Sequence, residues 1–257
     1  MKKTTLSIVI PCYNEENNLK RGVLNDVYSF LTKQPFDWEV LVCNDESTDN
    51  SLKLVKEFVS KHQGFKVLDL PHGGKPSAVW GGIQKAKYPI VLFTDMDQST
   101  PLKESLKLLP YFDQGYSVVI GSRGAVRQGA SLIRKIMARG FLSGRRLFLL
   151  HNIVDTQCGF KAIKTDLAKK IFPNLQFFKD KSDKKGWRVS AFDVELLFMA
   201  QKWGYKIKEV LVKWKDEDSS TTKGDDTKRF KKESQQMLQE IIRVKYNDLR
   251  GFYDQKK

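Results

Sequence analysis

Short apolar segments alternate with amphipathic segments through the first half of the chain, and this alternation constrains the fold more than any other feature. Between the apolar segments, large apolar side chains recur every three or four residues, the spacing that places them on one face of a helix. Strands that alternate with helices of roughly 10 to 20 residues predict a mostly parallel sheet covered by helices on both faces, an α/β fold. The five predicted strands span residues 6–10, 39–43, 65–70, 90–93 and 117–121.

A cluster of polar residues follows each of the first four predicted strands. In an open parallel sheet, ligands collect beyond the carboxyl ends of the strands. We therefore expect the four clusters to meet at one edge of the sheet and to form a single site. They are Tyr13-Asn14-Glu15, Asn44-Asp45, Gly73-Gly74-Lys75 and Asp95-Met96-Asp97.

The last of these clusters has the composition of a metal site. Asp95 and Asp97 stand one residue apart at a strand end, where two carboxylates can share a hard divalent cation through oxygen ligands. Such a cation would neutralise a departing diphosphate. An isolated Asp-x-Asp pair is more often a solvated turn, but three other polar strand ends facing the same edge favour the metal site here.

The other polar residues allow two interpretations each. Asp45 could accept hydrogen bonds from a base or ribose, or it could cap the following helix. The carboxylate of Glu15 suits a ligand site and equally any helix N-terminus. Lys75 follows two glycines and opens a helix, so it is either a phosphate contact or a solvated surface lysine. Asn14 is expected to cap the first helix, and Ser47, Thr48 or Asp49 the second.

The chain is strongly basic, with 45 basic and 30 acidic residues and a net charge of +15. This excess indicates a polyanionic partner. On a helical wheel, segment 132–150 has aliphatic residues on one arc and basic residues on the other, so it is either a helix that lies in a bilayer interface or a core-facing helix with a solvated side. Seven basic residues and no acidic one lie between positions 123 and 150, namely Arg123, Arg127, Arg134, Lys135, Arg139, Arg145 and Arg146.

Several classes of protein are disfavoured. The basic segment carries aliphatic residues in place of interleaved stacking aromatics, which argues against a nucleic-acid-binding protein. No apolar run approaches the roughly 20 residues of a membrane span. The three cysteines form no Cys-x-x-Cys pair and favour a reducing compartment. We expect a cytoplasmic protein that is peripheral on the cytoplasmic face of a membrane. A membrane protein is a possible partner there.

Five ordered motifs resemble those of glycosyltransferase family 2, and within it the dolichyl-phosphate β-glucosyltransferases, which are related to the dolichol-phosphate mannose synthases. The resemblance covers about residues 6–220 and implies a GT-A (Rossmann-like) fold with C-terminal amphipathic helices. The motifs are IVIPCYNEE (8–16), NDESTD (44–49), DMDQSTP (95–101), DTQCGFK (155–161) and AFDVELL (191–197).

The resemblance also implies roles for individual residues. Asp95 and Asp97 would hold Mg²⁺ or Mn²⁺, with Met96 against the nucleotide, while Ser99 replaces a metal-binding glutamine of the mannose synthases and is left out of the metal shell. The nucleotide-sugar pocket would include Pro11, Tyr13, Glu15, Cys43 and Asp45, to which the position of Lys75 at a helix start adds a phosphate contact. The acceptor-phosphate site would include Arg123, Gln157, Lys161 and Lys215, and Arg127 of the basic segment is expected to join them.

The activity implied by the resemblance is inverting transfer of a hexose, glucose from UDP-glucose, onto a polyprenyl (dolichyl or undecaprenyl) phosphate. GDP-mannose remains an alternative donor, because Asn44 and Glu46 depart from the family motif. A soluble or polysaccharide acceptor is the alternative acceptor, and its hydroxyl would need a general base. Asp193 or Glu195 would be the first candidate, although each could equally cap its helix or lie on its polar face.

The second half of the chain is expected to contain a polar turn at 155–160, a helix at 192–203 and a strand at 206–214. A final amphipathic helix is expected at 230–248. In terms of domains, the sequence predicts one transferase domain at 1–220. Its nucleotide-sugar half is 1–122 and its acceptor half is 123–220, with an interfacial segment at about 131–150. Residues 221–257 would form the C-terminal amphipathic helix.

Overall fold

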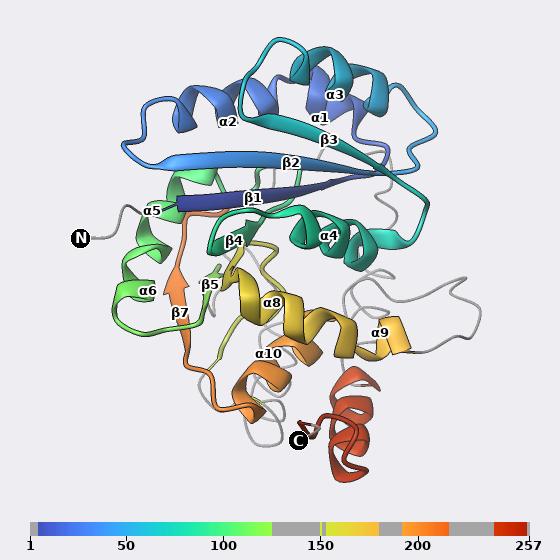
Figure 1. Ribbon diagram of the computed structural model, residues 1–257, viewed down its shortest axis with the longest axis vertical. Coiled ribbons are helices and arrows are strands. Elements are labelled where there is room, and N and C mark those ends of the chain that lie inside the picture. Colours follow the sequence, from blue (N-terminus) through green and yellow to red (C-terminus); the bar gives the residue numbers. More distant parts are fainter. Residues whose placement is uncertain (1–4, 125–149, 151–152, 180–191, 216–238, 256–257) are drawn as a thin grey trace, which may run out of the picture.

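The computed structural model of the chain describes residues 5–124, 150, 153–179, 192–215 and 239–255 (Figure 1). They form one sheet of seven strands in the order β3-β2-β1-β4-β6-β5-β7. The strands are β1 (Thr5–Cys12), β2 (Asp37–Asp45), β3 (Phe65–Leu70), β4 (Ile90–Phe93), β5 (Val118–Ser122), β6 (Lys161–Lys164) and β7 (Ile207–Leu211). All five predicted strands of the first half are confirmed, with ends within a few residues of the prediction.

The sheet is mostly parallel, as predicted. β1 pairs in parallel with β2 and β4, β2 with β3, and β5 with β7. The exception is β6, which runs antiparallel to both of its neighbours, β4 and β5. The sequence reasoning missed β6 because it is only four residues long, too short to display a period.

Helices cover both faces of the sheet, with α1 to α3 on one side and α4 and α8 on the other (Figure 1). Successive β1 side chains alternate between the two resulting cores: Ile8 and Ile10 pack in one, and Val9 packs in the other. The helices are α1 (Glu16–Lys20), α2 (Val23–Leu31), α3 (Ser51–Val59), α4 (Gly74–Lys85), α5 (Ser105–Leu108), α6 (Pro110–Asp113), α8 (Thr165–Ile171), α9 (Gln176–Lys179) and α10 (Phe192–Lys202), with 3₁₀ turns η1 (Leu102–Glu104) and η2 (Phe172–Asn174).

Of the two predictions about helix starts, the one for Asn14 was wrong and the one for Asp49 was confirmed in part. Asn14 does not cap the first helix: it has a positive φ of 54° and its side chain accepts a hydrogen bond from the Thr48 amide instead. That helix is also divided into α1 and α2 by Gly22, whose φ is 86°. At α3 the residue before the helix is Asn50. The Asp49 carboxylate accepts a hydrogen bond from the Ser51 amide at 2.9 Å, so one of the three predicted residues does bond a backbone amide at the start of α3.

The C-terminal part agrees with the prediction where it is described. Helix α10 and strand β7 form as expected, and residues 239–249 are helical. The rest of the predicted final helix, and all of the predicted interfacial segment except Leu150, lie outside the described residues. Within the described ranges, no helix is long and apolar enough to cross a membrane.

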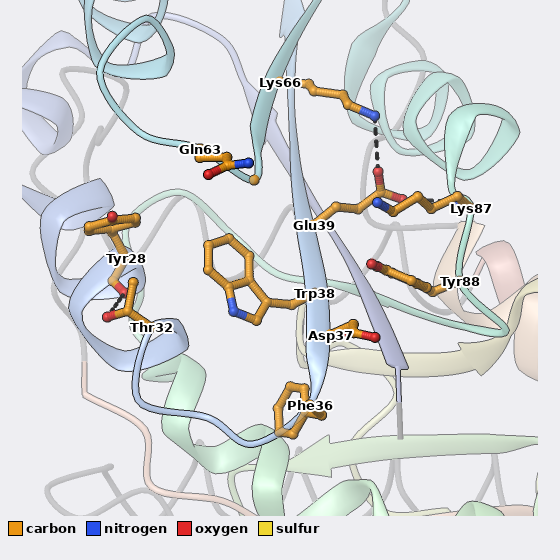
Figure 2. A pocket seen from close by; sticks show the side chains of 11 residues that line it. Tyr28, Thr32, Phe36, Asp37, Trp38, Glu39, Gln63, Lys66, Lys87 and Tyr88 are labelled. Atoms are coloured by element: carbon orange, nitrogen blue, oxygen red, sulfur yellow. Dashed lines mark hydrogen bonds and ion pairs between the residues drawn. The ribbon is translucent and has the colours of Figure 1, made fainter. Parts of the chain in front are cut away.

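A surface pocket of about 500 Å³ lies where the central strands begin, at the edge opposite the polar clusters (Figure 2). At its wall, Glu39 is almost fully buried. The Glu39 carboxylate accepts hydrogen bonds from the Ser7 hydroxyl at 2.8 Å and the Lys87 amide at 2.9 Å, and pairs with the Lys66 ammonium at 3.3 Å. These bonds join β1, β2, β3 and the segment before β4, so Glu39 holds the sheet together at this edge.

Candidate active site

The four polar clusters meet at one edge of the sheet, as predicted. The strands that precede them are mutually parallel, so their carboxyl ends lie together. Hydrogen bonds also join the loop after β1 directly to the loop after β2 and the start of α3. The Asn14 carboxamide accepts the Thr48 amide at 2.8 Å, and the Ser51 hydroxyl accepts the Glu15 amide at 2.7 Å. The loops after β1 and β2 therefore form one rigid wall of the site.

Asp45 links the second and third clusters. Its two carboxylate oxygens accept the Gly73 amide at 2.8 Å and the Gly74 amide at 2.9 Å, and the side chain is 3% exposed. Free amides at a helix start are good partners for a carboxylate. Asp45 thus fixes the start of α4, not that of α3, and it presents almost no surface to a base or ribose.

Lys75 links the third and fourth clusters, because its ammonium forms an ion pair with Asp95. Burial opposes the charged form of Asp95, but the charges of Lys75, Lys161 and Arg123 outweigh it and hold the pKa of Asp95 below its usual range. Burial likewise opposes the charged lysine, but Asp95 and Asp193 raise the pKa of Lys75. Lys75 is therefore a charged part of the site and not a solvated surface residue.

The Asp97 carboxylate is oriented by Ser99. Its Oδ1 accepts the Ser99 amide and its Oδ2 the Ser99 hydroxyl, both at 2.9 Å. Groups that hydrogen-bond a metal-binding carboxylate fix its direction. Ser99, which the sequence reasoning left out of the metal shell, is therefore a support for Asp97.

A relay of side chains connects Glu15 to the same loop. Asn18, fully buried in α1, donates to the Glu15 carboxylate at 2.6 Å. Arg21 donates to the Asn18 carbonyl oxygen at 3.2 Å and to the backbone carbonyl of Asp97 at 2.6 Å. Glu15 is thus connected to the Asp97 loop through Asn18 and Arg21. No spacing in the sequence indicated Arg21.

Gly159 brings the polar turn at 155–160 against Asp95. A Cβ atom built on Gly159 would lie 2.1 Å from Asp95 Oδ2, well inside van der Waals contact. The backbone of Gly159 does not have a positive φ, so alanine is excluded by the neighbouring carboxylate and not by backbone strain. This glycine sets how closely the turn approaches the acidic pair.

Replacing Gly159 by alanine is expected to lower transfer activity about 100-fold, because a shift of about 1 Å in a reacting group can have an effect of that size. The measurement is kcat/KM for sugar transfer, with circular dichroism to verify the fold. Gly115→Ala is the control for backbone strain alone: nothing lies within 4 Å of its added carbon, so its positive φ of 85° should lower stability somewhat and leave transfer activity unchanged. Full activity in Gly159→Ala would show that the position of Asp95 is unimportant.

Arg123, which follows β5, forms a bidentate ion pair with Asp155. Its Nε lies 2.7 Å from Asp155 Oδ2, and its terminal nitrogen donates to Oδ1 at 2.8 Å. Asp155 is itself fixed, because Glu209 accepts the Asp155 amide at 2.7 Å. Burial opposes both charges, yet the pair raises the pKa of Arg123 and lowers that of Asp155. The guanidinium therefore stays charged beside Asp95.

Lys161 and Asp193 form a buried ion pair. The Lys161 side chain is fully buried, lies 2.7 Å from Asp193 Oδ1 and donates to the Cys158 carbonyl at 2.5 Å. In this conformation the Lys161 ammonium is not available to an acceptor phosphate, in contrast to the expectation. Asp193, the first candidate for a general base, is neutralised by its partner.

Glu195, the other candidate base, is also engaged. It is fully buried, and its carboxylate accepts the Gln176 amide at 2.8 Å and pairs with Arg243 at 3.1 Å. These contacts tie α10 to α9 and to the helical residues 239–249. Glu195 therefore joins three helices, and its buried carboxylate is not exposed to an acceptor hydroxyl.

The remaining predicted residues differ in accessibility. Tyr13 is 44% exposed at the site edge, whereas Cys43 and Met96 are almost fully buried in the two cores. Burial raises the pKa of Cys43 to about 12, as in an apolar packing residue. The side chains of Cys43 and Met96 therefore do not face a ligand, which corrects those two assignments. Pro11 is partly buried at the end of β1.

Two acceptor-site candidates are placed by their backbones. The Gln157 amide donates to Asp155 Oδ1 at 3.2 Å, which sets it in the turn that holds Arg123. The Lys215 amide donates to the Ser99 carbonyl at 2.9 Å, which sets it beside the Asp97 loop. Arg127 lies outside the described residues.

Solved structures share this fold. Glucosyl-3-phosphoglycerate synthase from Mycobacterium tuberculosis, in complex with Mn²⁺, UDP and glucosyl-3-phosphoglycerate, superposes with a TM-score of 0.63 at 19% identity, over 94% of this chain and 80% of that one. The same enzyme in complex with Mg²⁺ and UDP gives a TM-score of 0.64. These are GT-A glycosyltransferases, so the predicted GT-A fold is confirmed.

Sequence comparison agrees. Dolichyl-phosphate beta-glucosyltransferase from Dictyostelium discoideum is 30% identical over 96% of this chain and 76% of its own length. The Drosophila melanogaster protein of that name is 33% identical over 84% of this chain and 68% of its own. The model of Glycosyl transferase family 2 matches residues 7–172. With its acidic pair at the end of β4 in a GT-A fold, the chain belongs to glycosyl transferase family 2 and is a glycosyltransferase.

Proposed function

We propose that this protein transfers glucose from UDP-glucose to a polyprenyl phosphate, with inversion at the anomeric carbon. The observation that carries the proposal is the state of the two candidate bases: Asp193 is paired with buried Lys161, and Glu195 with Arg243. A hydroxyl acceptor requires a base to remove its proton. A phosphate monoester does not, because its second pKa is about 6 and it is largely dianionic near neutral pH.

The relatives' names support the same acceptor and the same transferred sugar. The dolichyl-phosphate beta-glucosyltransferases of Dictyostelium discoideum and Saccharomyces cerevisiae align over 96% and 98% of this chain, so the similarity extends well beyond one shared motif. Dolichyl phosphate is therefore the first acceptor to test, and undecaprenyl phosphate the second. GDP-mannose is the alternative donor, and a soluble sugar or polysaccharide the alternative acceptor.

The donor end of the site fits a nucleoside diphosphate with a divalent cation. Mg²⁺ is often held by one or two carboxylates together with substrate phosphates, and Asp95 and Asp97 supply two such carboxylates. Among the described residues there is no group of three or more potential metal-binding side chains, so the substrate would complete the shell. Bound there, Mg²⁺ or Mn²⁺ would act as a Lewis acid towards the departing diphosphate.

Two basic residues of the chain would bind the phosphates of the two substrates. Lys75, at the start of α4, is placed to exchange its partner Asp95 for a donor phosphate. Arg123, held by Asp155, offers a fixed cation for the acceptor phosphate. Transfer by alignment and charge neutralisation needs little else, because the nucleophile is already ionised. Attack from the face opposite the diphosphate gives a β-linked product from an α-linked donor.

The acceptor would place the protein at a membrane. We propose peripheral attachment to the cytoplasmic face, supported by the net charge of +15 and by the basic residues between 123 and 150. Each basic residue near an anionic surface contributes about 1 kcal/mol. Flotation with anionic vesicles that weakens as salt rises would support this location, and the absence of flotation would overturn it.

In the deciding experiment, the purified protein is incubated with radiolabelled UDP-glucose, Mn²⁺ and one of two acceptors. The acceptors are a short-chain polyprenyl phosphate and the matching polyprenol, which differ only in the phosphate. We expect transfer to the phosphate alone, with a β-anomeric product by NMR. Transfer to the polyprenol or to a free oligosaccharide would overturn the acceptor, and faster transfer from GDP-mannose would overturn the donor.

A further inference from the structure

His72 lies in the loop between β3 and α4, next to Asp45 and across from Tyr13. Its Nδ1 is 3.1 Å from Asp45 Oδ2 and 3.2 Å from the Asp45 backbone carbonyl oxygen. Its backbone amide donates to Glu46 at 3.0 Å. The loop therefore holds the imidazole by both its backbone and one ring nitrogen.

The ring of His72 stands beside the ring of Tyr13. Their centroids are 4.9 Å apart and their planes are tilted by 38°. The side chain of His72 is 54% exposed and Tyr13 is 44% exposed. Two accessible rings at this corner provide a stacking face and a polar edge, which is how proteins hold single bases.

The surroundings of Nδ1 fix the tautomer of His72. Both atoms near it are oxygens that can only accept a hydrogen bond, so Nδ1 carries the proton. In the neutral ring Nε2 is then an acceptor. No other described residue makes a hydrogen bond to Nε2, and the exposed ring leaves it open to a ligand.

Asp45 cannot take this role itself. It is 3% exposed, and its oxygens already accept two backbone amides and the imidazole. The accessible acceptor at this corner is therefore the imidazole nitrogen that Asp45 orients.

We propose that His72 reads the edge of the donor nucleobase and selects a base that presents a ring N–H, as uracil does at N3, over one that presents a bare nitrogen there, as cytosine does. This inference rests on the proposed function, which places a nucleoside diphosphate in the site. Tyr13 provides the stacking face, and Asp45 is a positioning residue that sets the tautomer. A site built to accept one N–H rejects an analogue that lacks it, because the acceptor is then left unpaired.

The test compares binding of UDP and CDP in the presence of Mn²⁺ by isothermal titration calorimetry. The two ligands share the diphosphate and ribose and differ at the base edge. We expect the unsubstituted protein to bind UDP about tenfold more tightly than CDP, the effect of one hydrogen bond. In His72→Phe, which keeps a ring beside Tyr13, the two affinities should come within about twofold, chiefly because UDP binding weakens. His72→Gln, with a carbonyl acceptor, should recover part of the preference.

His62→Phe is the matched control. His62 also directs Nδ1 at a carbonyl oxygen, that of Phe58 at 2.7 Å, and stacks on the Phe58 ring with centroids 3.8 Å apart, but it precedes β3 at the opposite edge of the sheet. Its substitution should leave the ratio of UDP to CDP affinity unchanged. If His72→Phe keeps the full preference, the inference about His72 is wrong and the proposed function stands. If the unsubstituted protein binds neither nucleotide, the proposed function itself fails.

Discussion

Replacing Asp97 by alanine is expected to reduce sugar transfer about 1,000-fold and to leave the protein folded. The carboxylate is held in one direction by the Ser99 amide and hydroxyl, both at 2.9 Å, at the end of a buried strand. A cation that neutralises a leaving diphosphate contributes several kcal/mol to the transition state, and about 4 kcal/mol corresponds to this factor. The measurement is kcat/KM for transfer as a function of Mn²⁺ concentration.

The control for this variant is Asp113→Ala, which removes an exposed carboxylate from α6. It should keep full activity and the same Mn²⁺ dependence. Calorimetric titration of Mn²⁺ with UDP present should show binding to the unsubstituted protein and to Asp113→Ala but not to Asp97→Ala. Unchanged metal-dependent transfer in Asp97→Ala would remove the acidic pair from the mechanism.

Replacing Lys161 by methionine is expected to lower the free energy of unfolding by about 3–5 kcal/mol, because it leaves the Asp193 carboxylate buried without its partner. The pair is 2.7 Å apart, and the two side chains are 0% and 8% exposed. Urea unfolding followed by circular dichroism measures the change. Lys202→Met is the control: its ammonium lies 2.6 Å from both Asp248 and Asp254, but the side chain is 26% exposed, so each pair should contribute less than about 1 kcal/mol.

The double variant Lys161→Met with Asp193→Leu separates structure from catalysis. Replacing both charges with apolar groups should restore most of the stability. If Asp193 only balances Lys161, transfer to polyprenyl phosphate should then stay within about tenfold of the unsubstituted protein. A decrease in transfer rate of about 10²- to 10⁴-fold, typical of the loss of a general base, would show that Asp193 acts as that base and would favour a hydroxyl acceptor.

Much of the fold could be predicted because the central strands are buried on both faces. Residues 8–12, 40–43 and 90–93 are continuous apolar runs, and each is followed by polar residues, a pattern typical of interior parallel strands. From the alternation with helices, the position of the acidic pair at the end of β4 follows directly. The strand β6 could not be found in this way, because it is short and its pairing partners are distant in the chain.

The sequence by itself determined the class of fold, the edge of the sheet that carries the site, and the acidic pair, since all three depend on local apolar runs and on the residues that end them. Only the tertiary structure decided which charges face each other. Lys161 and Asp193 are separated by 32 positions, as are Arg123 and Asp155, and their pairing cannot be read from spacing. The physical reason is desolvation: once the chain folds, a buried charge must find an opposite charge, and that partner decides whether the group binds substrate or holds the protein together.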